Sequence, residues 1–439
     1  MPSSKAGSSL VSPPPSDWRA RARKISSDFR AHAGDLDPSD PNPATTVDPN
    51  PTATALERCA RALSPAGYGG LYHRGSAYFV GFTSDVDLNL SRLHAAFPDV
   101  EVHAFLARHS WDELRRISHA ITRLMTASSA AGNILSVGPD EVRNVVEVEV
   151  RHPGSVLAKS LRTRYGSAIV LVPGDPIELL STATPSIGSP SGLLGRPVSG
   201  SFRAAARPPS PAPGRTTYQD PMLAGMQIRA RGNAACTAGF MYRGSLNPVD
   251  TSEGGVITAG HCFGGQVATT EWSQGGKKLG PFTRQRLVPR TRADAGTITT
   301  EFTKGVGFRN ISNQVYVAPG AGTIAITTRA ALNQGARGDI ALRSGAYSGF
   351  DDGTLGTGGE GRPYFVDEAP FTRYVIFNVY KATFSKAIKL GDSGSPVFRG
   401  DGVALGILFA RKARNHRVGF YSQIRNVENE LRVPVYTGG

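Results

Sequence analysis

A serine between two glycines is the residue of this sequence best suited to covalent chemistry. Ser393 lies in the segment Leu390–Val397, which reads Leu-Gly-Asp-Ser-Gly-Ser-Pro-Val. Flanking glycines allow a tight turn and let a substrate carbonyl approach the backbone closely. In such a turn the N–H groups of Gly391 and Ser393 point at one spot, where an oxyanion would form. A plain Gly/Ser/Pro turn between strands is the alternative, so the chain must also supply a base and an acid.

A histidine and an aspartate earlier in the chain can fill those two roles. His261 lies in Thr-Ala-Gly-His-Cys, directly after a strand-like apolar run. Histidine is the natural base for a serine because it exchanges protons near neutral pH. Asp294 opens a further strand-like run and offers a carboxylate that would orient the imidazole. The order His, Asp, Ser is that of one serine-protease class and differs from the order in subtilisins and α/β-hydrolases.

Composition limits the other functions that the chain can have. Its 439 residues suffice for two or three compact domains, and a net charge of +14 could indicate a nucleic-acid partner. The basic residues are scattered, however, so we expect no nucleic-acid binding. No apolar run reaches the ~18 residues of a membrane helix. Three cysteines exclude a zinc site of thiolates alone, and the histidines lack metal-ligand spacing, so we expect neither metal nor cofactor.

Composition also changes along the chain, and it predicts four parts. Residues 1–54 are rich in Pro, Ser, Asp and Asn and are expected to be disordered. Residues 55–180 carry helical and strand patterns and predict a small α+β domain, with a capping box at Ser110 and Glu113. Residues 181–221 are a Pro/Ser-rich linker, and residues 222–439 have short strand-like runs between Gly-rich turns, typical of a β-barrel or sandwich.

The chemical residues sit in segments that resemble the chymotrypsin-fold serine proteases, most closely the bacterial streptogrisin and alpha-lytic group. Thr258–Cys262 and Gly391–Gly394 resemble the histidine and serine motifs of that family. Other segments resemble its first cysteine strand, its Arg-x-Gly-x-Thr-x-Gly segment and its C-terminal helix and last strand: Cys236–Phe240, Arg343–Gly349 and Phe420–Tyr436. The resemblance covers about Ala224 to Tyr436 and implies two six-stranded antiparallel β-barrels. More weakly, residues 55–180 resemble the pro-regions that precede such proteases.

The resemblance implies a role for each residue of the motifs. Ser393 would be the nucleophile, His261 the base and Asp294 the acid, with an oxyanion hole formed by the Gly391 and Ser393 N–H groups. Its structural features would be a disulfide and an ion pair that replaces the freshly cut N-terminus of animal trypsins: Cys236 with Cys262, leaving Cys59 unpaired, and Asp392 with Arg343.

One rival for the acid exists. Asp339 lies in Gly-Asp-Ile-Ala-Leu, which resembles the string around the acid in animal trypsins. It precedes Arg343 by only four residues, inside a segment that matches a later barrel strand. We therefore prefer Asp294.

The walls of the specificity pocket depart from the family pattern. Ala387 stands where the group has a cysteine, and Leu408, Phe409, Ala410 and Arg411 replace a Ser-Gly-Gly-like segment. The bulk of Phe409 or Arg411 would narrow or close the pocket. No acid stands at its base, so a preference for Lys or Arg is not supported and the specificity stays open.

These observations predict a serine endopeptidase that is made as a precursor and acts on protein or peptide substrates. The N-terminal domain would be its intramolecular chaperone or inhibitor until the linker is cut, or else an unrelated accessory domain. A non-catalytic protease-fold binding module and a serine esterase are the alternatives. The family and one disulfide suit an extracellular protein, although the start of the sequence shows no signal peptide.

Overall fold

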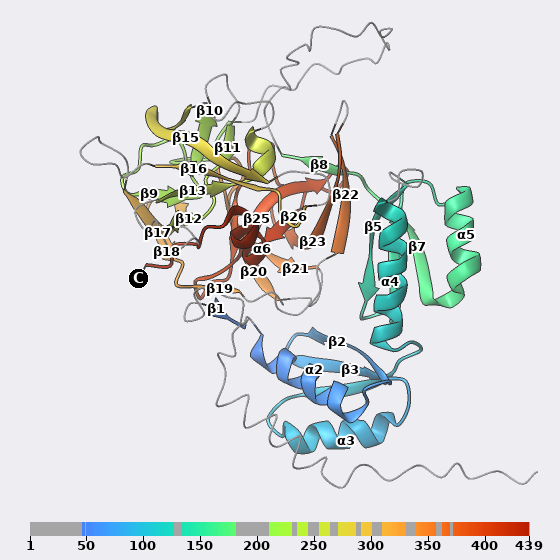
Figure 1. The fold of residues 1–439 in the computed structure, drawn as a ribbon. Helices are drawn as coiled ribbons and strands as arrows, with labels where there is room; N and C mark the ends of the chain where they lie inside the picture. The colour runs from blue at the N-terminus through green and yellow to red at the C-terminus, as the bar shows by residue number, and fades with distance from the viewer. Residues whose placement is uncertain are drawn as a thin grey trace, which may run out of the picture.

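The structure is a computed structural model of the chain. It describes residues 46–48, 50–126, 133–180, 210–230, 235–244, 254–263, 271–286, 291–300, 310–330, 339–356, 362–368 and 372–438. They form an N-terminal domain (residues 50–180) and a C-terminal domain that is almost all β (residues 210–438) (Figure 1). Most of the segment predicted to be disordered, residues 1–54, lies outside the described residues. Its described part contains β1 (Thr46–Val47) and the start of a helix.

The first half of the N-terminal domain is a three-stranded sheet with two helices. Its elements are α2 (Pro51–Leu63), β2 (Tyr68–Arg74), β3 (Ala77–Phe82), α3 (Val86–Ala96) and β4 (Val102–Leu106). The hairpin β2–β3 is antiparallel, and β4 adds to β3 in parallel. The Asn50 side chain accepts the Ala53 N–H at 3.0 Å and so caps α2.

The second half of this domain is a helix packed on a sheet that leads into the C-terminal domain. Its elements are α4 (Trp111–Thr126), β5 (Ile134–Asp140), β6 (Val145–Val150), α5 (Val156–Tyr165), η2 (Gly166–Ala168), β7 (Ile169–Pro173) and β8 (Ile177–Leu179). Ser110 caps α4 by accepting the Glu113 N–H at 3.3 Å. Leu114, Ile117 and Ile121 are buried at helical spacing, so this face of α4 faces the core.

The first sheet of the C-terminal domain is curled, and its two end strands are close neighbours in the sequence. Its strands are β10 (Gln227–Ala230), β11 (Ala235–Thr237), β12 (Met241–Arg243), β13 (Gly254–Thr258), β14 (Glu271–Gln274), β15 (Lys277–Arg286) and β16 (Ala295–Thr299). They pair in the order β11-β10-β14-β15-β16-β13-β12. Both end strands belong to the single stretch 235–243.

The second sheet closes into a six-stranded barrel. Its strands are β20 (Ile340–Gly345), β21 (Gly349–Leu355), β23 (Thr372–Phe384), β24 (Pro396–Phe398), β25 (Val403–Lys412) and β26 (Val418–Gln423). Antiparallel pairs run β20-β21-β23-β26-β25-β24 and return to β20. The all-β prediction is confirmed. Of the two six-stranded barrels expected, this one is a closed ring of pairs, and the other is the curled seven-stranded path.

The remaining elements of the C-terminal domain lie around these sheets. They are β9 (Met222–Ala224), η3 (Gly260–Phe263), β17 (Ile311–Ala318), β18 (Gly322–Ala325), β19 (Thr328–Ala330), β22 (Arg362–Glu368) and α6 (Ile424–Leu431). The packed part of the domain begins before residue 222, where the sequence predicts the domain to start. Arg215 is already buried and donates to the Gly225 carbonyl at 2.9 Å and to the Ser344 hydroxyl at 2.6 Å.

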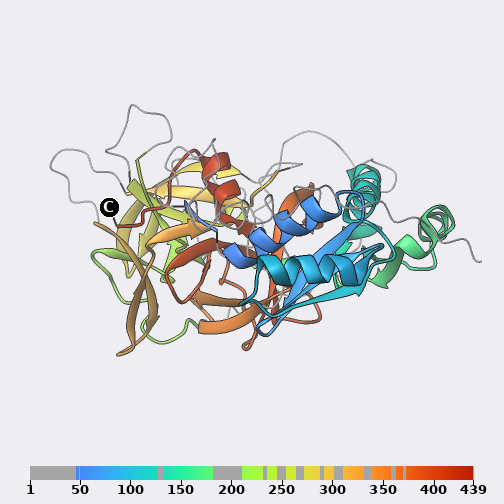
Figure 2. The same ribbon diagram turned by 90° about the horizontal axis from the view of Figure 1, so that it is seen from below.

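Two strand pairs join the N-terminal domain to the C-terminal domain. β5 pairs with β22 through Ser136 and Tyr364, and β8 pairs antiparallel with β25. Figure 2 shows from below that the N-terminal domain lies along one side of the all-β domain. Within the described residues, no helix is long and apolar enough to cross a membrane.

Candidate active site

Three predicted residues meet in a hydrogen-bonded line between the two sheets. His261 Nε2 lies 2.6 Å from Ser393 Oγ, and His261 Nδ1 lies 2.6 Å from Asp294 Oδ2. All three residues are buried. A carboxylate only accepts, so Nδ1 carries the proton, and in the neutral ring Nε2 is left to accept from the serine hydroxyl. This is the arrangement in which a serine can be deprotonated as it attacks.

Strand pairing explains how residues so far apart in sequence come together. His261 lies in η3 just after β13, and Asp294 directly precedes β16. Because β13 and β16 pair antiparallel, the end of one lies beside the start of the other. The Asp294 carboxylate also accepts the His261 backbone N–H at 2.9 Å, which fixes the two residues at main-chain level.

A serine on the second barrel holds Asp294 from behind. The Asp294 N–H donates to Ser422 Oγ at 2.9 Å, and Ser422 is buried on β26. Sequence reasoning missed this residue. Its only signal was a lone hydroxyl after the apolar pair Phe420 and Tyr421 in a buried strand.

The rival acid, Asp339, lies elsewhere. Its Oδ1 is 2.8 Å from His73 Nε2, so it contacts the N-terminal domain. The structure therefore brings Asp294, and not Asp339, to His261.

The serine turn needs its two glycines. Gly391 and Gly394 have φ of 93° and 91°, a region that disfavours side chains. A Cβ on Gly391 would come within 2.2 Å of the Tyr347 ring, and one on Gly394 within 2.1 Å of Thr258 Oγ1. The turn is also held by Thr237, whose hydroxyl donates to the Gly391 carbonyl at 2.9 Å. Thr237 lies in the segment Cys236–Phe240, and sequence reasoning predicted no role for it.

Asp392, beside the serine, anchors the turn to β20. Its Oδ2 accepts from Arg343 at 3.2 Å, the ion pair that the sequence predicts, and from the Lys389 N–H at 2.8 Å. Its Oδ1 accepts the Tyr347 and Ser348 N–H groups at 2.9 and 3.0 Å. The carboxylate is thus fully bonded although it is buried.

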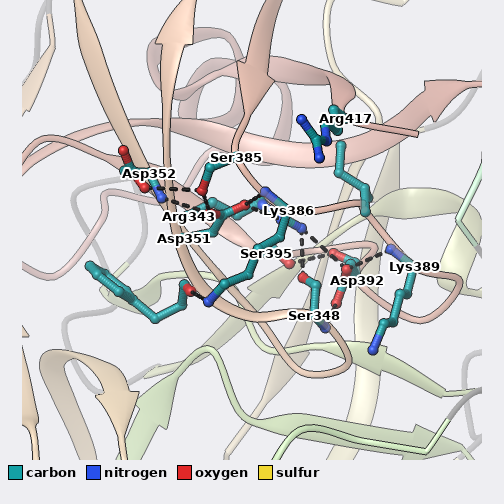
Figure 3. A network of polar contacts seen from close by, with 12 residues as sticks. Arg343, Ser348, Asp351, Asp352, Ser385, Lys386, Lys389, Asp392, Ser395 and Arg417 are labelled. Atoms are coloured by element: carbon teal, nitrogen blue, oxygen red, sulfur yellow. Dashed lines mark hydrogen bonds and ion pairs between the residues drawn. The ribbon is translucent and has the colours of Figure 1, made fainter. Parts of the chain in front are cut away.

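Arg343 is shared with a second buried carboxylate that the sequence did not reveal. Its other terminal nitrogen donates to Asp351 Oδ2 at 2.9 Å, and Asp351 also accepts the Lys386 N–H at 2.8 Å (Figure 3). One arginine therefore links the serine turn to strands β20 and β21. Asp351 stands in a strand that alternates in burial, with no motif to mark it.

The cysteines form the pair that the resemblance implies. Cys236 on β11 and Cys262 on η3 are joined by a disulfide, which ties the His261 segment to the neighbouring strand. Cys59 is free and buried in the N-terminal domain.

The predicted pocket residues lie on β25, with one exception. Leu408, Phe409, Ala410 and Arg411 are buried, whereas Ala387 is exposed and its neighbour Ile388 is buried instead. Side chains fill the space beside Gly419, because a Cβ there would lie 2.7 Å from Ile388 Cδ1 and 2.8 Å from Leu408 Cδ1. These walls are apolar.

A segment of the N-terminal domain lies against this strand. β8 pairs with β25 in the register Leu179 with Ala410 and Glu178 with Arg411. The next residue, Leu180, donates its N–H to the Phe409 carbonyl at 3.3 Å and accepts the Gly391 N–H on its carbonyl oxygen at 2.6 Å. The Gly391 N–H, one of the two donors predicted for an oxyanion hole, therefore already donates to a main-chain carbonyl oxygen.

Within the described residues, no group of three or more His, Cys, Asp or Glu side chains could hold a metal ion. The geometry offers proton transfer and nucleophilic attack by a hydroxyl beside a main-chain donor.

The C-terminal part of the chain matches a known sequence family. Residues 217–430 match the sequence model of the Trypsin family. Among solved structures, the chain is similar to a Cellulomonas bogoriensis chymotrypsin, with 19% identity over 49% of this chain and 98% of that chain and a TM-score of 0.36. It is also similar to a glutamic acid-specific serine protease (22%, 49% and 100%, 0.38) and to the alpha-lytic protease homologue N4 (15%, 47% and 95%, 0.35). No curated protein sequence matches the chain.

Proposed function

We propose that this chain, whose residues 217–430 form a trypsin-like serine protease domain, is an endopeptidase that works through Ser393, His261 and Asp294. One observation carries the proposal. The hydrogen-bonded line from Asp294 through His261 to Ser393 ends beside the Gly391 N–H, which already donates to a main-chain carbonyl oxygen.

Each residue then has one task. The Ser393 hydroxyl attacks a peptide carbonyl carbon while His261 Nε2 takes its proton. Asp294 holds the ring by Nδ1 and stabilises the imidazolium. The Gly391 and Ser393 N–H groups stabilise the negative charge on the carbonyl oxygen. His261 then protonates the leaving amine, and water releases the acyl group from Ser393.

We also propose that the protease is made as an inactive precursor. β8 and Leu180 of the N-terminal domain occupy the strand and the N–H group that a substrate would need. A peptide cannot bind there until this segment leaves, so the N-terminal domain inhibits the site. The pairs of β5 with β22 and of β8 with β25 also suit a folding aid for the second barrel. A disulfide fits an extracellular setting.

A fluorophosphonate probe tests the catalytic proposal. Full-chain protein is incubated until it processes, and probe labelling, chain cleavage and hydrolysis of a peptide library are followed together. We expect labelling of Ser393 to appear as the chain is cut, and to be absent in Ser393→Ala. Processed wild-type protein that neither labels nor cleaves peptides would be a binding module rather than an enzyme. Labelling with turnover of esters but not of peptides would indicate an esterase.

A further inference from the structure

The segment that enters the site from the N-terminal domain has the geometry of a bound peptide. β8 runs antiparallel to β25, and Leu180 follows it directly. The Leu180 N–H donates to the Phe409 carbonyl oxygen at 3.3 Å, and Ser393 Oγ lies 3.4 Å from that same oxygen. The Leu180 carbonyl oxygen in turn accepts the Gly391 N–H at 2.6 Å. The carbonyl of Leu180 is therefore the one presented to Ser393.

The side chain of Leu180 indicates what the first pocket accepts. It is completely buried in the same apolar core as Ile388 and Leu408. The pocket therefore suits a leucine-sized apolar residue before the cleaved bond.

Two positions before Leu180, a charged pair joins β8 to β25. Arg411 Nε and Nη2 both lie 2.9 Å from Glu178 Oε2. The remaining nitrogen, Arg411 Nη1, donates to the Ile388 carbonyl at 2.5 Å, which fixes the guanidinium. The Arg411 side chain is only 10% exposed, whereas Glu178 is 40% exposed. Arg411 is thus a fixed, mostly buried cation that faces β8. Glu178 is its more exposed partner, and an acidic residue of another peptide could take the place of Glu178.

We infer that Arg411 is a specificity-determining residue that selects an acidic side chain two residues before the residue at the cleaved bond. This inference rests on the proposed function, and it assigns Ile177-Glu178-Leu179-Leu180 as the first segment that the protease cuts in its own chain. The protease then cuts its chain after Leu180 and prefers peptides with an acidic residue at the position of Glu178 and leucine at that of Leu180. A lysine or arginine at the Glu178 position would meet a like charge.

The self-cleavage follows the same chemistry as the proposed reaction. Ser393 Oγ bonds to the Leu180 carbonyl carbon, and its proton passes to His261 Nε2. The bond to the Ser181 nitrogen breaks, and that nitrogen takes the proton from His261. Water then adds to the acyl carbon, returns a proton to Ser393 Oγ through His261, and leaves a carboxylate on Leu180.

The first experiment follows processing of the full chain by intact mass and N-terminal sequencing. We expect a new N-terminus that begins Ser181-Thr182-Ala183, absent in Ser393→Ala. Glu178→Lys should slow this cleavage about tenfold, because it places a like charge against Arg411. The double variant Glu178→Lys with Arg411→Glu should recover most of the rate. Arg399→Glu is the matched control, since Arg399 pairs with Asp401 at the surface of the C-terminal domain and not with the segment that enters the site.

The second experiment uses processed wild-type enzyme, so it does not depend on whether a variant folds. Peptides containing Ile-Glu-Leu-Leu and Ile-Gln-Leu-Leu are compared, and kcat/KM should favour the first by about tenfold. Processed Arg411→Gln should lose this ratio.

The outcomes separate the two proposals. If the protein labels at Ser393 and cuts peptides, but cuts its own chain elsewhere or shows no preference for glutamate, the inference about Arg411 fails and the catalytic proposal stands. If Ser393 neither labels nor cuts any peptide, the catalytic proposal fails and the inference fails with it.

Discussion

At the scale of single residues, the arrangement around Asp294 sets the protonation of the site. Its two oxygens accept separately from the His261 ring and the His261 backbone, so neither is free to turn. An amide at this position would place a donor against one of these N–H groups. It would therefore favour the ring tautomer that cannot take a proton from Ser393.

We expect Asp294→Asn to lower kcat/KM of the processed enzyme by roughly 10⁴-fold while the fold is kept. The measurement is peptide hydrolysis with the fold checked by circular dichroism. Asp339→Asn is the matched control, because its carboxylate faces His73. It should stay within about twofold of wild type. A larger loss for Asp339→Asn than for Asp294→Asn would reverse the assignment of the acid.

Cys59 is a residue whose chemistry is suppressed by its surroundings. Burial raises the pKa of its thiol to about 11. The thiolate is the reactive form, so little of it exists at pH 8, and the side chain is also 1% exposed. We expect no alkylation of native protein by iodoacetamide at pH 8 within minutes, and one modified thiol per chain in denaturant without reductant. Rapid modification of the native protein would contradict this burial.

At the scale of elements, the serine turn is stabilised by charges that come from two neighbouring strands. Arg343 on β20 pairs with Asp392 in the turn and with Asp351 on β21, and all three side chains are fully buried. Removing the arginine would leave two carboxylates buried without their cation, and such changes cost about 3–5 kcal/mol.

We therefore expect Arg343→Met to lower both the melting temperature and the fraction of chains that a fluorophosphonate probe labels at Ser393. Differential scanning calorimetry and labelling stoichiometry measure the two effects. Arg399→Met is a control, because Arg399 pairs with Asp401 at the surface and such pairs contribute about 0–1 kcal/mol. Equal melting temperatures for the two variants would show that the buried network stabilises nothing.

The elements also show why some of the site could be predicted from sequence. Gly391 and Gly394 were visible because a backbone with positive φ leaves few alternatives to glycine. His261 and Ser393 could be predicted because each lies in a short motif, His261 after the end of a strand and Ser393 in the turn between the two glycines.

Other residues of the site left no such mark. Ser422 and Asp351 act through pairings between strands that are distant in the sequence, and a buried serine or aspartate has no local pattern. The sequence predicts Leu180 as the end of a small domain, because nothing in Ile-Glu-Leu-Leu indicates that this segment lies against a strand of another domain. Ala387 was placed by resemblance alone, and the structure exposes it while burying Ile388.

At the scale of the whole molecule, the N-terminal domain is held by charges as well as by strand pairs. Arg362 on β22 donates to Glu147 Oε1 on β6 at 2.9 Å and to the Pro139 carbonyl at 2.6 Å. Lys412 on β25 lies 3.4 Å from Glu149 of the same strand β6. The cations belong to the C-terminal domain and the carboxylates to the N-terminal domain, so cutting the linker leaves an interface whose strength depends on charge.

Acid should therefore release the N-terminal domain after cleavage. Burial alone would raise the pKa of Glu147, but the opposing charges of Arg362, Lys381 and Arg143 outweigh it and hold the pKa below its usual 4.5. Release removes this burial together with the charges of Arg362 and Lys381 and the Arg362 hydrogen bond. We expect the loss of the two cations to outweigh the loss of burial, so that the free domain has the higher Glu147 pKa. A carboxyl whose pKa is lower in the complex stabilises the complex above the free-state pKa, and this contribution is lost as pH falls through the bound value.

We expect the processed fragments to co-elute on size exclusion at pH 7 and to separate increasingly as the pH falls below about 4.5. Glu147→Gln should weaken the complex at pH 7 and flatten its dependence on pH, while Glu149 and Glu178 retain part of that dependence. Glu101→Gln is the control, because the Glu101 side chain contacts His103 and Ser76 of its own domain. A complex that holds equally well at pH 7 and pH 3.5 would show that strand pairing and apolar packing, rather than these charges, hold the N-terminal domain in place.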